Sequence, residues 1–165
     1  MLSNFFAKVF PFVFVVFFIY FEHAPIYFFN NELVRPLMTF TTVFCWISSD
    51  ETKFRPIWLL FFGLFYDILK DGIIGLTPIF FLILNHLQTR RSTILFADTM
   101  KENWLKFIVI VFFYFVSSYL INIFMESSSY NLYKNFVSFI LTIILFPFFY
   151  SMIQKLSYKF GNYNE

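Results

Sequence analysis

Asp67 is the residue whose type and position most suggest chemistry, because it is an acid near the end of a hydrophobic segment. Gly63 precedes it by four residues, so the two positions share one face of a helix. The glycine would permit close approach of a neighbouring helix, and the carboxylate could accept a hydrogen bond from it. An ionisable group inside a membrane span is by default a functional hypothesis. An equally weighted alternative is that Asp67 pairs with Lys70 at the membrane interface and only ends the helix.

No other combination of residues predicts catalysis. His23 and His86 fall on opposite sides of the membrane in the topology derived below, and the single cysteine, Cys45, cannot complete a set of metal ligands. The sequence has neither a G-x-S-x-G motif nor a glycine-rich phosphate loop. Asp67 and Asp98 are also predicted on opposite sides, which disfavours a membrane peptidase with paired aspartates. We therefore predict that the protein is not an enzyme and binds no metal or cofactor.

The composition requires that membrane helices position these residues. Hydrophobic residues make up 59% of the 165 residues and charged residues only 13%, against roughly 25% charged in a soluble domain. A soluble fold of this size would lack the polar side chains to cover its surface. Thirty residues are phenylalanine, which lipid accepts as readily as leucine. The net charge of +2 is too small for a nucleic-acid-binding surface.

Hydropathy divides the chain into six segments, which we interpret as the membrane spans of one all-α domain covering residues 1–165. No small-x-small cleavage pattern follows the first segment, so we expect it to remain as an anchor. The third would rise only ~24 Å as a helix, against ~30 Å of hydrocarbon. We expect it to cross with local thinning of the bilayer, which costs less than burying charges in a re-entrant hairpin. The expected spans are 5–21, 33–49, 54–69, 73–87, 104–125 and 136–156.

The sequence allows two positions for the start of the fourth helix. It begins at residue 73 if the whole apolar segment is helical. Alternatively, Thr77 is the N-cap and Pro78 the first helical residue, which leaves residues 72–76 as an apolar turn.

Lysine and arginine residues predict the orientation of the bundle. With the N-terminus inside, nine basic residues lie on the inner side and three on the outer side, as the positive-inside rule requires. Both termini are therefore expected in the cytoplasm. The inner set is Lys8, Lys53, Arg55, Arg90, Arg91, Lys101, Lys106, Lys155 and Lys159, and the outer set is Arg35, Lys70 and Lys134.

A family resemblance is carried by residues 36–78. A tryptophan precedes a helix that starts with proline, and a glycine–leucine pair, an aspartate and a second glycine–leucine pair follow. In this pattern, in its length and in its six spans, the chain resembles the MreD family of rod-shape-determining membrane proteins of bacteria. The matching residues are Pro36, Trp46, Arg55, Pro56, Gly63, Leu64, Asp67, Gly75 and Leu76.

The resemblance implies a multi-pass protein of the bacterial cytoplasmic (inner) membrane, with a fold similar to the substrate-binding subunits of energy-coupling-factor transporters. It implies a non-enzymatic scaffold of the cell-elongation complex, which helps to maintain rod shape and to position lateral peptidoglycan synthesis. The implied partners, besides the lipid bilayer, are an MreC-like membrane protein, an MreB-like cytoskeleton and a RodA/penicillin-binding transpeptidase complex.

The alternative function is the substrate-binding subunit of a vitamin or small-molecule transporter. Such subunits dock through small-residue motifs on the first helix, and this first segment has no small-x-x-x-small pair. On the leading interpretation, the stripe with Gly63 and Asp67 packs against an MreC-like helix or, equally, against a helix of the same chain. The candidate residues for helix packing or partner contact are Gly63, Asp67, Pro56, Trp46 and Gly75.

Overall fold

The computed structural model describes residues 2–24, 27–28, 31–32, 34–49, 54–70, 73–89, 100–124 and 132–161. In these residues it contains six α-helices and one pair of two-residue strands, so the expected all-α membrane helix bundle is confirmed. The strands β1 (Tyr27–Phe28) and β2 (Asn31–Glu32) pair antiparallel between the first two helices. The helices are α1 (Leu2–His23), α2 (Met38–Ser49), α3 (Pro56–Leu69), α4 (Leu76–Thr89), α5 (Met100–Phe124) and α6 (Leu132–Gly161).

The helix boundaries differ from the hydropathy segments for local reasons. Pro36 disfavours a helical conformation at the residue before it, and α2 starts only at Met38. Pro56 is the first residue of α3, where its missing N–H and fixed φ fit a helix start. The fourth helix begins at Leu76, which lies between the two expected starts, because Gly75 has a φ of 102° and so breaks the helical path.

The fifth and sixth helices are longer than the segments that predicted them. α5 begins at Met100 instead of residue 104, and α6 runs from Leu132 to Gly161 instead of 136–156. A helix continues through polar residues as long as its own backbone bonds are made, whereas hydropathy detects only the apolar part. By length and composition, α5 and residues Leu132–Tyr158 of α6 suffice to cross a membrane, and three other apolar helical segments are shorter.

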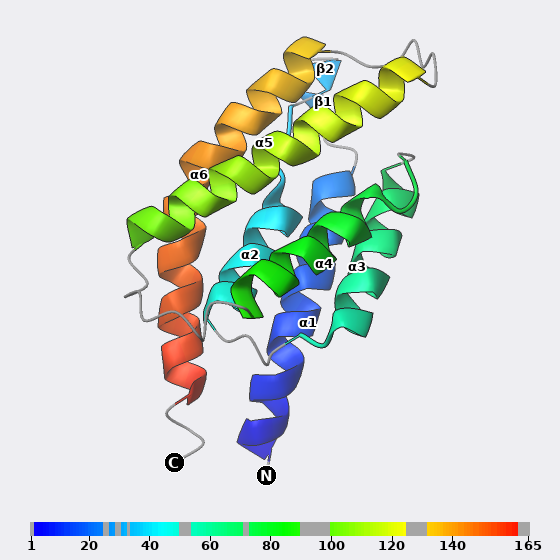
Figure 1. Ribbon diagram of the computed structural model, residues 1–165. Coiled ribbons are helices and arrows are strands. Elements are labelled where there is room, and N and C mark those ends of the chain that lie inside the picture. The colour runs from blue at the N-terminus through cyan, green and yellow to red at the C-terminus, as the bar shows by residue number, and fades with distance from the viewer. Residues whose placement is uncertain are drawn as a thin grey trace.

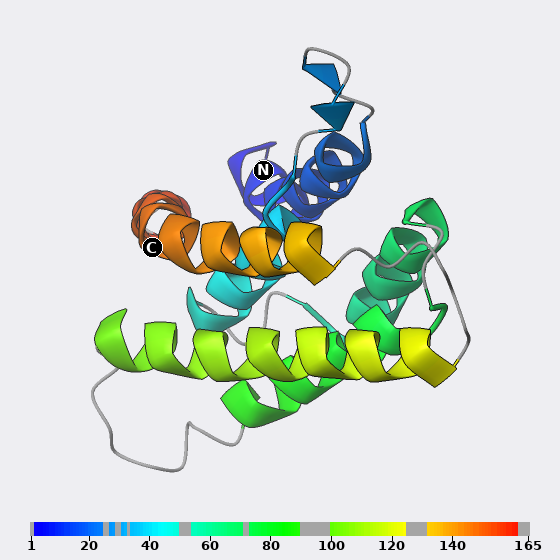
Figure 2. The ribbon, with the colours of Figure 1, turned by 90° about the horizontal axis from the view of Figure 1, so that it is seen from above.

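The helices run alternately between two ends of the bundle (Figure 1). At one end α1 begins, α2 ends, α3 begins and α6 ends, and we call this the terminal end. The other end holds the β1–β2 pair, the end of α3 and the start of α4, and we call it the turn end. α3 and α4 form a closely packed hairpin, α2 packs on α1 and α6, and α5 packs on α6. Viewed from above, the long helices α5 and α6 lie side by side (Figure 2).

α2 is the central helix of the bundle, because every residue from Thr39 to Ile47 is buried. Its aromatic rings contact rings from each of the other five described helices, for example Phe40 against Phe81 at 4.8 Å between centroids and Phe44 against Phe107 at 5.2 Å. The hydroxyl of Thr41 donates to the carbonyl of Leu37 within its own turn. A polar side chain that is satisfied in this way can lie in an apolar core without an unpaired group. Some phenylalanines, such as Phe40 and Phe44, fill this core, whereas others, such as Phe61, are exposed on the outside of the bundle.

Candidate functional site

A buried carboxylate at the end of α1 joins three helices. The Glu22 side chain is only 8% exposed. Its Oε2 accepts hydrogen bonds from the backbone N–H of Thr39 at 3.0 Å and from the Thr39 hydroxyl at 2.8 Å. Its Oε1 accepts a hydrogen bond from the Tyr66 hydroxyl at 2.5 Å. Since Thr39 lies in the first turn of α2, this acid satisfies one of the N–H groups that a helix start leaves unpaired.

A second buried carboxylate does the same for α4. Asp67 is 3% exposed, and its Oδ2 accepts hydrogen bonds from the backbone N–H groups of Gly75 at 2.8 Å and Thr77 at 3.2 Å. These two groups precede and open α4, where the helix dipole also favours a negative charge. The acid near the end of one helix thus caps the next helix in the chain.

The ammonium group of Lys70 is directed to tyrosines instead of to the neighbouring Asp67. Its Nζ donates to the Tyr114 hydroxyl at 3.2 Å. It also lies 5.5 Å from the ring centroid of Tyr66 and 5.3 Å from that of Tyr114, within the range of a cation–π contact. The Tyr114 hydroxyl is in turn 3.3 Å from the Thr77 hydroxyl. These contacts bring α5 into the same polar group.

The segment before α2 is held by α6. The backbone N–H of Leu37 donates to the Thr142 hydroxyl at 2.9 Å, and the Ser138 hydroxyl donates to the carbonyl of Arg35. Arg35 itself donates through Nη1 to the carbonyl of Glu22. All six described helices and this segment therefore meet in one set of polar contacts near the turn end. We call Glu22, Thr39, Tyr66, Asp67, Lys70, Thr77 and Tyr114 the turn-end cluster.

The chemistry available to the turn-end cluster is helix capping and helix joining. Its two carboxylates are occupied by backbone N–H and hydroxyl donors of the same chain. His23 bonds through Nδ1 to the carbonyl of Ile19 at 2.7 Å, and its ring packs edge-on against Tyr66. Within the described part of the chain, no group of three His, Cys, Asp or Glu side chains could hold a metal ion. Because its hydrogen bonds join several helices and cap the starts of two of them, the cluster is a structural centre of the bundle.

Gly63 lies directly against the start of α4. A Cβ atom built at this position would be 2.5 Å from both the backbone nitrogen and the Cα of Pro78, which is far inside van der Waals contact. Gly63 and Asp67, the two residues of the expected stripe, thus both face α4 of the same chain. The glycine provides room for the backbone of α4, and the aspartate provides its cap.

Of the other three candidate residues, Gly75 lies next to the contact between α3 and α4, whereas Trp46 and Pro56 lie elsewhere in the bundle. Gly75 belongs to the α3–α4 connection and supplies the positive φ that its turn requires. Trp46 is buried near the end of α2, where its ring meets Phe10 and Phe14 of α1. Pro56 is exposed at the first position of α3, at the terminal end. Whether any of the five candidates contacts a partner stays a prediction.

Sequence reasoning did not identify Glu22, Thr39 and Tyr66 as members of the site. Glu22 is an acid directly after an apolar segment, as Asp67 is, and the same rule on acids in membrane spans would have selected it. No comparable signal exists for the other two, because a threonine or tyrosine in an apolar segment is common. Their partner is 17 and 44 residues away in the sequence.

Comparison with known proteins identifies one family. The family model described as rod shape-determining protein MreD matches residues 3–156 of this chain. This match extends over nearly the whole chain, far beyond residues 36–78 that carried the resemblance, and confirms it. No curated protein and no solved structure matches the chain.

Proposed function

Because this chain belongs to the MreD family of rod shape-determining proteins, we propose that it is a non-enzymatic membrane scaffold of the cell-elongation complex. In this role it helps to maintain rod shape and to position lateral peptidoglycan synthesis. The observation that carries the proposal is the family match over residues 3–156. Its partners are an MreC-like membrane protein and, directly or through it, an MreB-like cytoskeleton and a RodA/penicillin-binding transpeptidase complex.

The chemistry of the turn-end cluster supports a scaffold. A scaffold needs a fixed arrangement of helices, and the acids Glu22 and Asp67 are both used to fix where a helix starts. The family is a shape-determining family and not a known enzyme family. Buried polar groups whose hydrogen bonds are all satisfied make a core rigid and specify one packing arrangement. A docking surface on the outside of the bundle needs such a rigid support.

The proposed contact surface is the outward face of the α3–α4 hairpin. Gly63 and Asp67 shape this hairpin from inside, whereas Ile57, Phe61 and Ile68 of α3 point away from the bundle and are exposed. The rings of Phe61 and Phe65 stack along this face with an interplanar angle of 3°. α3 is 14 residues long, or ~21 Å as a helix. Such a helix is shorter than the hydrocarbon core, and mismatch of this kind favours association with another helix.

A substitution on this face tests both the surface and the function. In cells depleted of the wild-type chain, we expect Phe61→Ala to give normal protein levels, reduced co-purification of the MreC-like partner and rounded cells. The reason is that Phe61 is 56% exposed, so its loss removes contact area outside the core. Measurements are the partner-to-bait ratio after affinity purification and the length-to-width ratio of the cells.

Phe113→Ala is the matched control, because Phe113 is 57% exposed but lies on α5. It should retain the partner and the rod shape. If Phe61→Ala also retains both, the proposed contact surface is wrong. If depletion of the wild-type chain leaves the cells rod-shaped, the proposed function is wrong.

The proposed orientation places the terminal end of the bundle in the cytoplasm. The distribution of basic residues, nine to three, supports it, and so does the position of the start of α1 and the end of α6 at one end (Figure 1). In a Cys45→Ser background, single cysteines at Ser127 and Asn162, both outside the described residues, should react differently with an impermeant thiol reagent. We expect labelling at position 127 in intact spheroplasts and at position 162 only after lysis. Labelling of position 162 in intact spheroplasts would reverse the orientation.

A further inference from the structure

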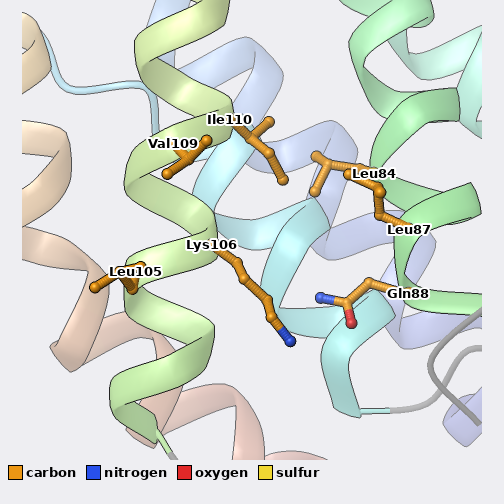
Figure 3. A pocket seen from close by; sticks show the side chains of 7 residues that line it. All are labelled: Leu84, Leu87, Gln88, Leu105, Lys106, Val109 and Ile110. Atoms are coloured by element: carbon orange, nitrogen blue, oxygen red, sulfur yellow. The ribbon is translucent and has the colours of Figure 1, made fainter. Parts of the chain in front are cut away.

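A small apolar groove lies between α4 and α5, away from the turn-end cluster (Figure 3). Its volume is about 250 Å³. Its base is closed by Leu84 and Ile110, which are buried and face one another from the two helices. The residues that line it are Leu84, Leu87, Gln88, Leu105, Lys106, Val109 and Ile110.

The two polar residues of the groove lie together at one end. Figure 3 shows Lys106 of α5 and Gln88 of α4 extending toward the same space, below the aliphatic side chains. Lys106 is exposed, and the long apolar stem of a lysine can follow a groove wall while its ammonium group reaches the membrane surface. The groove is thus an apolar slot with a cation at its end.

The size of the groove limits what can occupy it. Ligand pockets for vitamin-sized molecules are generally ~300–1,000 Å³ and contain several convergent polar groups, so this groove is small for such a ligand. A helix of a partner protein is ~10 Å across with its side chains and would not enter it. A segment of a single acyl chain is narrower, wholly apolar and always present in a membrane.

We propose that this groove binds an anionic phospholipid, with an acyl chain between α4 and α5 and the headgroup phosphate on Lys106. Basic positions between helices on the cytoplasmic side are suited to acidic headgroups, because that leaflet is rich in anionic lipid. Gln88 lies in the last turn of α4 and Lys106 in the second turn of α5, beside the same inter-helix connection. The assignment of the site to the cytoplasmic leaflet depends on the orientation proposed above. The match between an apolar groove with a lysine and an anionic lipid does not depend on it.

Lipid titration of the purified full-length chain tests the charge requirement. Native mass spectrometry in detergent would compare phosphatidylglycerol with phosphatidylcholine of identical acyl chains. We expect the wild-type chain to prefer phosphatidylglycerol, and Lys106→Gln to lower that affinity about fivefold, equivalent to ~1 kcal/mol. Affinity for phosphatidylcholine should stay unchanged, and Lys106→Arg should retain the preference. Lys101→Gln is the control, because Lys101 is an exposed lysine of the same helix outside the groove.

Filling the groove tests the position of the acyl chain. Leu87 lines the groove and is 53% exposed, so Leu87→Trp adds bulk there without disturbing the buried core. We expect this variant to fold normally and to bind both lipids several-fold more weakly. If Leu87→Trp bound both lipids as tightly as the wild type, the proposal would be overturned. It would also be overturned if Lys101→Gln and Lys106→Gln lowered the affinity for phosphatidylglycerol equally. Loss of the MreC-like partner in Leu87→Trp with unchanged lipid binding would instead assign the groove to a protein.

Discussion

Replacing Gly63 with leucine is expected to break the α3–α4 hairpin and to leave little folded protein in the membrane. The Cβ atom alone would lie 2.5 Å from two backbone atoms of Pro78. A backbone neighbour cannot rotate away as a side chain can, so α4 would have to move and Asp67 would lose its place at the start of α4. Overpacking by single methylene groups already costs ~1–3 kcal/mol, and leucine adds four carbons. Membrane abundance and the thermal unfolding midpoint in detergent measure the effect.

Two other variants make this test specific. Gly63→Ala should be folded but less stable than the wild type by ~1–3 kcal/mol, since it adds only the Cβ atom. Ser151→Leu adds bulk on an exposed position of α6 and should leave the unfolding midpoint nearly unchanged. Normal abundance and stability of Gly63→Leu would show that α3 and α4 do not approach as closely as they do in this structure.

Replacing Glu22 with leucine is expected to destabilise the bundle by ~2–6 kcal/mol. The change leaves the Tyr66 hydroxyl and the backbone N–H of Thr39 without their acceptor. Each buried group that loses its partner costs ~1–3 kcal/mol. The expected readout is a large drop in the unfolding midpoint, together with earlier hydrogen exchange in the first turn of α2.

Glu22→Gln is the matched variant, because it keeps the size and one carbonyl oxygen. It should lose less stability than Glu22→Leu, since the amide can still accept the Thr39 N–H bond and donate to the Tyr66 oxygen. Tyr66→Phe, which removes one bond, should cost less than Glu22→Leu and be near the ~0.6 kcal/mol average of interhelical hydrogen bonds in membranes. Equal stability of Glu22→Leu and the wild type would exclude a capping role for this acid.

The two capping acids, Glu22 and Asp67, couple the positions of neighbouring helices. Glu22 and Asp67 each end one helix and cap a later one, so α1 sets the start of α2 and α3 sets the start of α4. A displacement of α3 would therefore be transmitted to α4 through the bonds of Asp67 and the close contact at Gly63. Such coupling would suit the scaffold role that we propose.

Several features of this protein could be predicted from its sequence. Six apolar segments separated by polar intervals require a helix bundle in lipid, because every backbone polar group must be satisfied within the helix. The spacing of Gly63 and Asp67 places both on one helix face, and the structure shows both against α4. The family pattern implied a third helix that starts with proline, and α3 starts at Pro56, two residues after the expected span of 54–69 begins. These are local properties, and each depends on residues within a few turns.

The tertiary structure decided which groups pair. For Asp67 the sequence offered Lys70, a partner helix or, equally, a helix of the same chain. In the structure the carboxylate caps α4 of the same chain, and the Lys70 ammonium group donates to Tyr114. Glu22 looked like an ordinary acid after an anchor segment, yet it accepts bonds from α2 and α3. The identity of such partners depends on how helices far apart in sequence are packed and on where each helix starts. Local residues such as Pro36 and Gly75 limit where those helices can start. The pairing of each start with a distant acid depends on the tertiary packing and could not be derived from local pattern alone.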